Sequence, residues 1–370
     1  MGVSLMNKAF KFRIYPTQTQ QTLIHMTLGH NRFLWNKMLE DKQKQYELDK
    51  TMLYNRPAQY KDTYPFLKVI DSLSLANTQL NLEKAFKQFF NHKQDFPKFH
   101  SKKQDYGYTT NLVNNNIVLL KGYIKLPKLG EVKIKQHRAI PSDMTLKNVT
   151  VSKSSTGKYY VSILYEYQKE IKRQEIKTSI GLDFSMNHFY VDHQGFKLDY
   201  PTDIQTDFIK LSILQRSLSR RIKGSSNYHK KVLEIALLHE RIRHKRDDFL
   251  HKLSNAITKR YDLVSVERLN LIEMSQTNPY YAKQISRFGW TRFVSFLKYK
   301  LESQGKTLMV MDQWYPSSKT CSTCGEIHSE LKLNNRVFEC KQCELHLDRD
   351  HNAAININQE GLRQYKLAFQ

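Results

Sequence analysis

Two acidic residues stand at the ends of short apolar segments, where they could act as catalytic carboxylates. Asp183 ends the segment Ser179–Asp183, and Glu267 ends the segment Leu263–Glu267. Both segments are typical of buried strands, and the carboxyl ends of such strands form the crevice of an α/β sheet. A single strand-end acid is more often a turn or capping residue than a ligand, so each needs further acidic partners to support chemistry.

A third acid lies in the segment Asp348–Asn356, which has the pattern of a helix start. Asp348 is well placed to cap that helix, and chemistry alone does not choose between Asp348 and Asp350 as a ligand. Three converging carboxylates raise one another's pKa and therefore require cations. Two Mg²⁺ (or Mn²⁺) ions would neutralise them and clamp the attacking and leaving oxygens of a phosphodiester. The acids thus favour metal-dependent phosphodiester hydrolysis.

The four cysteines of the chain have the spacing of a metal site. They form two C-x2-C pairs separated by fifteen residues: Cys321, Cys324, Cys340 and Cys343. This pattern predicts a zinc ribbon, in which four thiolates make a closed tetrahedral site without an open position for catalysis. A pair of disulfides is the alternative, and a reducing compartment disfavours it. We therefore predict one structural Zn²⁺.

The charge of the chain indicates a polyanionic partner. The 370 residues include 59 Lys and Arg against 35 Asp and Glu, a formal net charge of +24. Such an excess most often serves nucleic-acid binding. A membrane surface is the alternative, but no apolar run approaches the ~20 residues of a spanning helix. Met1–Phe12 lacks the apolar core of a signal peptide, so we expect a cytoplasmic, nucleoid-associated bacterial protein.

Part of this positive charge falls in a long helical region at roughly Thr206–Arg260. Its basic side chains could line a phosphate backbone or could form a solvated helix face. A nuclease centre nearby would favour the phosphate-binding role. The residues that we predict to contact nucleic acid are Arg216, Arg220, Arg221, Lys223, Arg241, Arg243, Lys245 and Arg246.

Hydrophobic periodicity predicts an α+β, multidomain chain. Phe10, Phe12 and Ile14 alternate with basic residues as in a half-buried strand, and strand patterns return after Asn111, beyond a helical stretch. The predicted parts are a small β-barrel (1–16 and 112–170), a helical module (17–111), a linker (171–177), a mixed α/β domain (178–318 and 348–370) and the zinc ribbon (319–347).

The order of these motifs resembles the TnpB family, the transposon-encoded RNA-guided nucleases related to type V CRISPR effectors. The resemblance covers nearly the whole chain. It is carried by Lys11–Thr17, Asn31–Asn36, Phe96–Phe99, Leu126–Gly130, Gly181–Ser185, Val266–Asn270, Tyr315–Gly325 and Asp348–Asn356.

This resemblance implies a RuvC-like, RNase-H-type nuclease domain in the C-terminal half, carrying the zinc ribbon as an insert. It implies that Asp183, Glu267 and Asp350 are the metal-binding catalytic acids, and it favours Asp350 over Asp348. For the N-terminal half it implies a wedge-like β-barrel with a helical recognition module. The implied partners are a guide RNA from the transposon end and double-stranded target DNA beside a short target-adjacent motif.

The leading hypothesis is therefore an RNA-guided DNA endonuclease. The alternative is a nuclease-silent RNA-guided DNA-binding repressor or transposition regulator, which the complete set of three acids disfavours. A guide-free junction resolvase would explain the acids but not the large basic N-terminal half. The sequence does not identify protein partners, and it indicates no membrane association.

Overall fold

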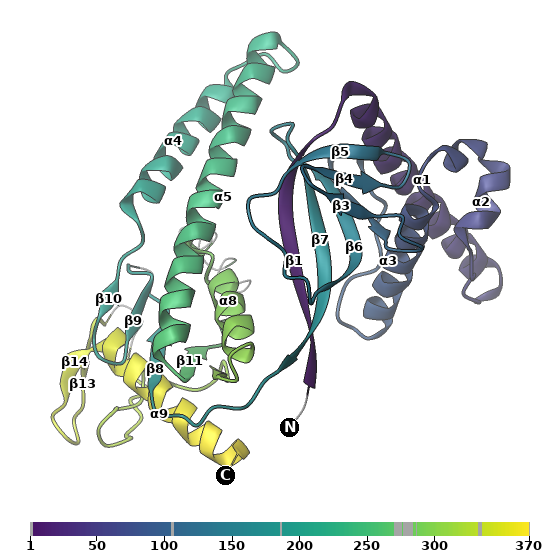
Figure 1. Ribbon diagram of the computed structural model, residues 1–370. Coiled ribbons are helices and arrows are strands. Elements are labelled where there is room, and N and C mark those ends of the chain that lie inside the picture. Colours follow the sequence, from purple (N-terminus) through teal and green to yellow (C-terminus); the bar gives the residue numbers. More distant parts are fainter. Residues whose placement is uncertain are drawn as a thin grey trace. The chain divides into compact units, whose positions relative to one another are not determined.

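The computed structural model describes residues 3–104, 107–185, 187–269, 276, 284–285, 287–331 and 335–369 (Figure 1). The last residue of the motif Val266–Asn270 lies outside this part of the chain, as does Met1. Two compact units emerge, Val3–Lys169 and Glu170–Gln370, each with its own apolar core.

A seven-stranded sheet forms the centre of the N-terminal unit, in the order β2-β6-β7-β1-β5-β4-β3. The alternation predicted for the first strand is confirmed, since Phe10, Phe12 and Ile14 are buried while Lys11 and Arg13 are exposed. The strands are β1 (Val3–Tyr15), β2 (Gly107–Asn111), β3 (Val118–Leu120), β4 (Tyr123–Leu126), β5 (Gly130–Lys135), β6 (Thr145–Lys153) and β7 (Tyr159–Glu170).

This sheet is open, so the predicted β-barrel is wrong. Strands β2 and β3 form its two edges, and across the described residues neither pairs with the other. Closure into a barrel needs both edges paired with a defined stagger, whereas alternation along a strand only specifies which face is buried. Strand β2 belongs to the sheet, although its residues fall within the predicted helical module.

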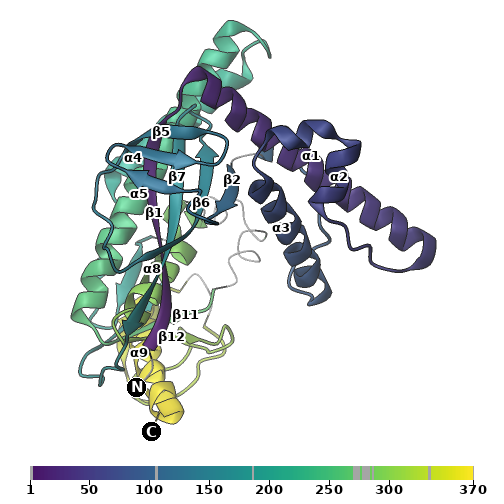
Figure 2. The ribbon, with the colours of Figure 1, turned by 45° about the vertical axis from the view of Figure 1, so that its right-hand side comes forward.

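The helical stretch between β1 and β2 folds around a separate apolar core. Thr17 and Gln20 form a reciprocal capping box at the start of the first helix, and Asp71 caps the third by accepting a hydrogen bond from Leu73. The helices are α1 (Gln18–Asp49), α2 (Pro57–Thr63) and α3 (Ser72–Phe90), with the short 3-10 helices η1 (Pro65–Val69) and η2 (Lys102–Gln104) (Figure 2).

The C-terminal unit contains a five-stranded sheet in the order β10-β9-β8-β11-β12. Strands β8, β11 and β12 run parallel, and β9 and β10 are antiparallel neighbours. The strands are β8 (Ser179–Asp183), β9 (Tyr190–Asp192), β10 (Lys197–Leu198), β11 (Leu263–Glu267) and β12 (Thr307–Met311). The helices are α4 (Thr202–Ser219), α5 (Ser226–Arg260), α8 (Trp290–Glu302) and α9 (Arg349–Phe369).

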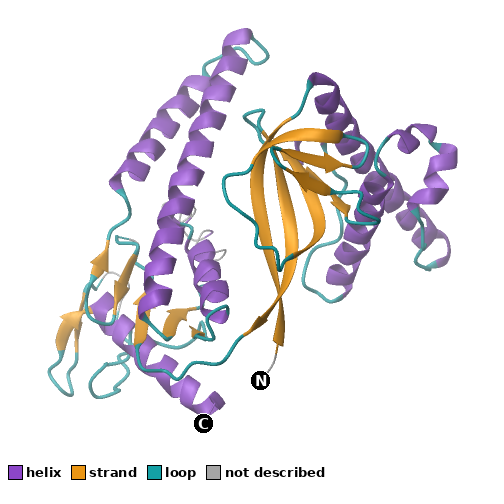
Figure 3. Cartoon of the chain, viewed as in Figure 1, coloured by secondary structure: helices purple, strands orange, loops and turns teal. Residues whose placement is uncertain are grey.

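The predicted long basic helical region consists of two helices. Helices α4 and α5 form an antiparallel pair joined by a short turn (Figure 3). Gly224 takes a positive φ of 88° in this turn, a conformation that glycine adopts at little cost. Ser225 then caps α5 by accepting a hydrogen bond from the backbone amide of Tyr228.

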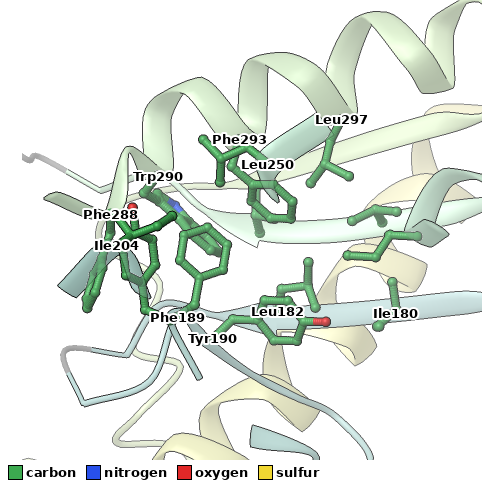
Figure 4. Close-up of a cluster of buried hydrophobic side chains, with 14 of the residues drawn as sticks. Ile180, Leu182, Phe189, Tyr190, Ile204, Leu250, Phe288, Trp290, Phe293 and Leu297 are labelled. Atoms are coloured by element: carbon green, nitrogen blue, oxygen red, sulfur yellow. The ribbon is translucent and has the colours of Figure 1, made fainter. Parts of the chain in front are cut away.

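Helices cover both faces of the five-stranded sheet. Ile180 and Leu182 of β8 point into an apolar cluster that includes Leu250 of α5 and Phe293 of α8 (Figure 4). Helix α9 packs against the same strands, and especially against β8. Within the described residues, none of the helices has the length and apolarity to cross a bilayer.

Candidate active site

Parallel pairing of β8 and β11 brings the first two acids to one edge of the sheet. Leu182 lies opposite Val266 in the register, so Asp183 and Glu267 are the next residues of adjacent strands. Side chains alternate along a strand. Since Ile180 and Leu182 enter the core on the side of α5 and α8, Gly181 and Asp183 face the opposite side, where α9 lies.

Two glycines allow α9 to approach this face of the sheet closely. A Cβ atom at Gly181 would overlap the carbonyl oxygen of Ala354 and would lie 2.6 Å from the backbone nitrogen of Asn358. A Cβ atom at Gly361 of α9 would likewise overlap the hydroxyl of Ser265 in β11. The backbone of α9 therefore rests directly on the two strands that end in acids, and the first turn of α9 lies near their carboxylates.

Asp348 and Asp350 play different roles at the start of α9. Asp348 Oδ1 accepts hydrogen bonds from the backbone amides of Asp350 and His351, each at 3.1 Å, so Asp348 caps the helix. Its other oxygen pairs with Lys197 at 2.7 Å. Burial alone would raise the pKa of Asp348, but Lys197 and the two amides lower it. Asp348 is thus fully engaged in structural contacts.

Asp350 instead belongs to the group formed by the strand-end acids. The Ser185 hydroxyl donates to Asp350 Oδ2 at 3.0 Å, and the Arg349 guanidinium lies 3.7 Å from Oδ1. The charge of Asp350 also acts on both Asp183 and Glu267, so the three acids from β8, β11 and α9 form one group.

Burial and neighbouring negative charge disfavour the ionisation of Asp183 and Glu267. Burial, followed by the negative charges of Glu267 and Asp350, raises the pKa of Asp183 well above its ordinary value of 3.8. Burial also raises the pKa of Glu267, and the charge of Asp350 adds to the effect, although a hydrogen bond from the Ser317 hydroxyl opposes it. The site therefore holds negative charge that the surrounding protein does not fully compensate.

A divalent cation fits this donor set. Carboxylate oxygens are the hard ligands that Mg²⁺ and Mn²⁺ take, and a cation would remove the mutual repulsion. The oxygens of the three acids do not all lie within 4.8 Å of one another, whereas the four cysteine sulfurs do.

The four cysteines form a compact cluster, in which Cys340 and Cys343 lie in the turn of a small hairpin. The hairpin strands are β13 (Val337–Glu339) and β14 (His346–Asp348). The sulfur of Cys321 lies 3.5 Å from that of Cys343, and the sulfur of Cys324 lies 3.6 Å from that of Cys340. None of the four is disulfide-bonded.

The two cysteine pairs have the same local backbone. Gly325 donates its amide to the carbonyl of Cys321 at 3.0 Å, and Glu344 donates to the carbonyl of Cys340 at the same distance. Both Gly325 and Glu344 have positive φ angles, of 80° and 60°. Two equivalent tight turns thus present four thiols to one point, an arrangement compatible with a tetrahedral zinc site.

Three of the predicted nucleic-acid contacts bind residues outside their own helix. Arg241 and Lys245 of α5 form ion pairs with the buried Asp207 of α4, at 3.3 and 2.7 Å. Arg246 donates to the carbonyl of Arg287 at 3.4 Å. These side chains hold helices and loops of the C-terminal unit together.

The other predicted contacts are exposed to solvent, as Arg241 also is, with 60% of its side chain accessible. Arg216, Arg220, Arg221 and Lys223 surround the turn between α4 and α5, and Arg243 lies on the exposed face of α5. Four closely spaced cations at the end of a helical pair form an accessible basic surface, which we call the basic tip (Arg216, Arg220, Arg221 and Lys223).

Sequence reasoning assigned no role to several buried polar residues that contact the acids or the segment beside them. Ser185 and Ser317 donate to Asp350 and Glu267, and Asn352 and Asn356 of α9 bind the segment before the cysteines. A signal that could have found the two asparagines is their spacing, four residues apart among alanines and isoleucines, which places both on one helix face.

Comparisons with known proteins agree with this arrangement. Residues 5–51 match a family model described as a helix-turn-helix domain of OrfB IS605, and here they form β1 and α1. Residues 162–278, which include Asp183 and Glu267, match a model described as a probable transposase, OrfB of IS605. Residues 290–357, which include Asp350 and the four cysteines, match the Cas12f1-like TNB domain.

Similar proteins extend over almost the full chain. A Streptomyces pristinaespiralis protein named "Putative RNA-guided DNA endonuclease" is 32% identical, covering 96% of this chain and 89% of that protein. The Escherichia coli K12 protein InsQ, with the same designation, is 28% identical and covers 95% and 91%. The chain belongs to the TnpB family, as the motifs predicted.

A solved structure shares the fold. The protein in the cryo-EM structure of the Cas12f1–sgRNA–target DNA complex has a TM-score of 0.61 to this chain at 11% identity. The match covers 96% of this chain and 99% of that one. The α+β, multidomain architecture is therefore that of Cas12f1.

Proposed function

We propose that this protein is an RNA-guided DNA endonuclease that hydrolyses phosphodiester bonds at Asp183, Glu267 and Asp350, in a RuvC-like domain. The supporting observation is the meeting of three carboxylates from β8, β11 and α9, where burial and mutual repulsion raise the pKa of Asp183. Relatives that match nearly the whole chain are named as RNA-guided DNA endonucleases.

The chain's own residues would bind cations and orient the scissile phosphate. Asp183, Glu267 and Asp350 would hold Mg²⁺ or Mn²⁺, and the bound ion would supply an activated water and neutralise charge on the leaving oxygen. The rigid ends of β8 and β11 keep two of these acids in register, and the Asp348 cap fixes the first turn of α9 that carries the third. Ser185 would restrain the side chain of Asp350.

The partners that we propose are a guide RNA from the transposon end and target DNA beside a short adjacent motif. Base pairing would read the target, and exposed cations such as those of the basic tip would contact phosphates. The four cysteines would bind one structural Zn²⁺.

The direct test is cleavage by the protein expressed with its flanking transposon DNA. Sequencing the copurified RNA should give one discrete species with a variable 3′ end, and that complex should cut a matching plasmid in Mg²⁺. Asp350→Ala should abolish cutting while RNA binding persists. Asp348→Asn, which keeps a good capping residue, is the matched control and should still cut.

The same experiment separates the alternative functions. Stable target binding without nicking in Mg²⁺ or Mn²⁺ would show a guided repressor or transposition regulator instead. Cutting that needs no RNA would show a guide-free nuclease.

A further inference from the structure

Ser317 connects the two candidate metal sites of the C-terminal unit. It lies four residues before Cys321, and its hydroxyl donates a hydrogen bond to Glu267 Oε1. Ser317 is buried, with 4% of its surface exposed. A residue that leads into the cysteine cluster thus holds the carboxylate at the end of β11.

Two asparagines of α9 hold the segment that contains Ser317. Asn356 Nδ2 donates to the carbonyl oxygens of Ser317 at 2.8 Å and of Thr320 at 2.6 Å. Asn352 Nδ2 donates to the same carbonyl of Thr320 at 2.7 Å. Both asparagines are buried, with at most 2% of their surface exposed.

The contacts continue to the first cysteine pair. Asn352 Oδ1 accepts a hydrogen bond from the backbone amide of Ser322, which lies between Cys321 and Cys324. Asn352 and Asn356 are one helical turn apart, so they present their amides on the same face of α9. Residues 317–322 are therefore fixed to the helix that also carries Asp350.

Buried polar side chains are stable only while each donor and acceptor keeps its partner, since a desolvated group without a partner is destabilising. Apolar side chains could fill the same space without this requirement, so packing alone does not account for the hydrogen bonds. The network runs from the cysteines through α9 and Ser317 to Glu267, so the position of the cysteine segment fixes the orientation of one acid.

We propose that Ser317 is a positioning residue for Glu267, and that Asn352 and Asn356 couple the cysteine cluster to the acid site. Zinc binding by the cysteines would then raise the affinity of Asp183, Glu267 and Asp350 for divalent cations. The inference rests on the proposed function, because it assumes that the acids bind such cations. Groups that orient metal ligands from behind usually change metal affinity or activity by about 10- to 100-fold.

The test measures Mn²⁺ binding to the full chain with its guide RNA by electron paramagnetic resonance. Ser317→Ala should weaken Mn²⁺ binding about tenfold and raise the half-saturating Mg²⁺ for cleavage by a similar factor. Its zinc content and guide RNA affinity should match those of the wild type. Ser317→Thr retains the hydroxyl and should lie closer to the wild type than to Ser317→Ala.

Ser265→Ala is the matched control. Ser265 is a buried serine of the same strand as Glu267, and its hydroxyl has no hydrogen-bond partner. Its removal should leave Mn²⁺ affinity unchanged. Equal Mn²⁺ affinities for Ser317→Ala and Ser265→Ala would overturn the role of Ser317.

The coupling to zinc requires two further variants. Asn356→Ala should weaken Mn²⁺ binding because it releases the carbonyl of Ser317, while zinc should remain because Asn352 still holds Thr320 and Ser322. Cys324 is exposed, and Cys324→Ser should lower both the zinc content and the Mn²⁺ affinity of the wild-type protein. In the Ser317→Ala background the same substitution should lower the zinc content without a further loss of Mn²⁺ affinity. An unchanged Mn²⁺ affinity after zinc loss would overturn the coupling.

Glu267→Gln separates failure of this inference from failure of the proposed function. If Glu267→Gln loses Mn²⁺ binding and cleavage while Ser317→Ala retains both, the positioning role is wrong and the nuclease site stands. If Glu267→Gln still cuts DNA, the proposed active site itself is wrong.

Discussion

Gly181 of β8 lies directly beneath the backbone carbonyl of Ala354 in α9, with no room for a side chain between them. This approach sets the height of α9 above the sheet and hence the place of Asp350 relative to Asp183. The acids can therefore assemble in this way only if residue 181 has no side chain.

Replacing Gly181 with alanine should destabilise the C-terminal unit. The added Cβ would overlap backbone atoms, which cannot rotate away, and overpacking of this kind costs about 1–3 kcal/mol. Chemical denaturation measures the change in the free energy of unfolding. Gly29→Ala is the control, because in α1 the nearest atom to its added Cβ is a flexible arginine nitrogen at 3.9 Å. That variant should be neutral or stabilised by up to ~1 kcal/mol.

The raised pKa of Asp183 and Glu267 predicts a pH-dependent stability in the absence of divalent cations. The folded protein retains protons on these acids that the unfolded chain, with ordinary values of 3.8 and 4.5, has already lost. The unfolded state therefore binds fewer protons than the folded state. The free energy of unfolding falls as pH rises above the ordinary pKa values, and it levels off above the raised pKa values of the folded state. Denaturation in a chelator should show this fall, and excess Mg²⁺ should reverse it.

Asp183→Asn isolates this effect from other titrating groups. The amide cannot ionise, so the difference in unfolding free energy between the variant and the wild type should grow in favour of the variant from acid to neutral pH. A difference that is independent of pH would show that Asp183 ionises normally in the folded state.

Metal analysis should find one zinc per chain. The four thiols meet at one point in a segment whose apolar cluster is small, so metal binding would supply much of its folding free energy. Removing zinc should expose the 319–347 segment to proteolysis while the five-stranded sheet persists. A folded, protease-resistant segment that contains no metal would contradict the zinc ribbon.

The basic tip should contribute to the salt dependence of nucleic-acid binding. Replacing Arg216, Arg220, Arg221 and Lys223 with glutamine should lower the slope of log affinity against log salt by about 3, if each contacts one phosphate. The control replaces Arg241 and Lys245, whose ion pairs with α4 indicate a stabilising role. That double variant should lower the unfolding free energy and leave the salt slope nearly unchanged.

The sequence predicted the parts of the site that depend on local patterns. Two five-residue apolar segments ending in Asp183 and Glu267 form strands whose ends lie in register, and the C-x2-C spacing predicted the cysteine cluster. The resemblance to TnpB favoured Asp350 over Asp348, and the structure shows Asp348 occupied as a helix cap.

The features that the sequence did not predict depend on contacts between distant segments. The alternation along a strand carries no information on whether the edges of the sheet meet, so the barrel could not be excluded. The pairing of Lys245 with Asp207 joins two helices, and Ser317 approaches Glu267 from 50 positions further along the chain. Serine and asparagine are common in loops and turns, so their type alone indicated nothing here.

The three-acid active site is tested most directly by locating Mn²⁺ by anomalous scattering in crystals of the chain with guide RNA and target DNA. We predict peaks bounded by Asp183, Glu267 and Asp350, next to a DNA phosphate. A cleavage-competent complex that holds Mn²⁺ elsewhere, with no ion at these three acids, would show that they are not the active site.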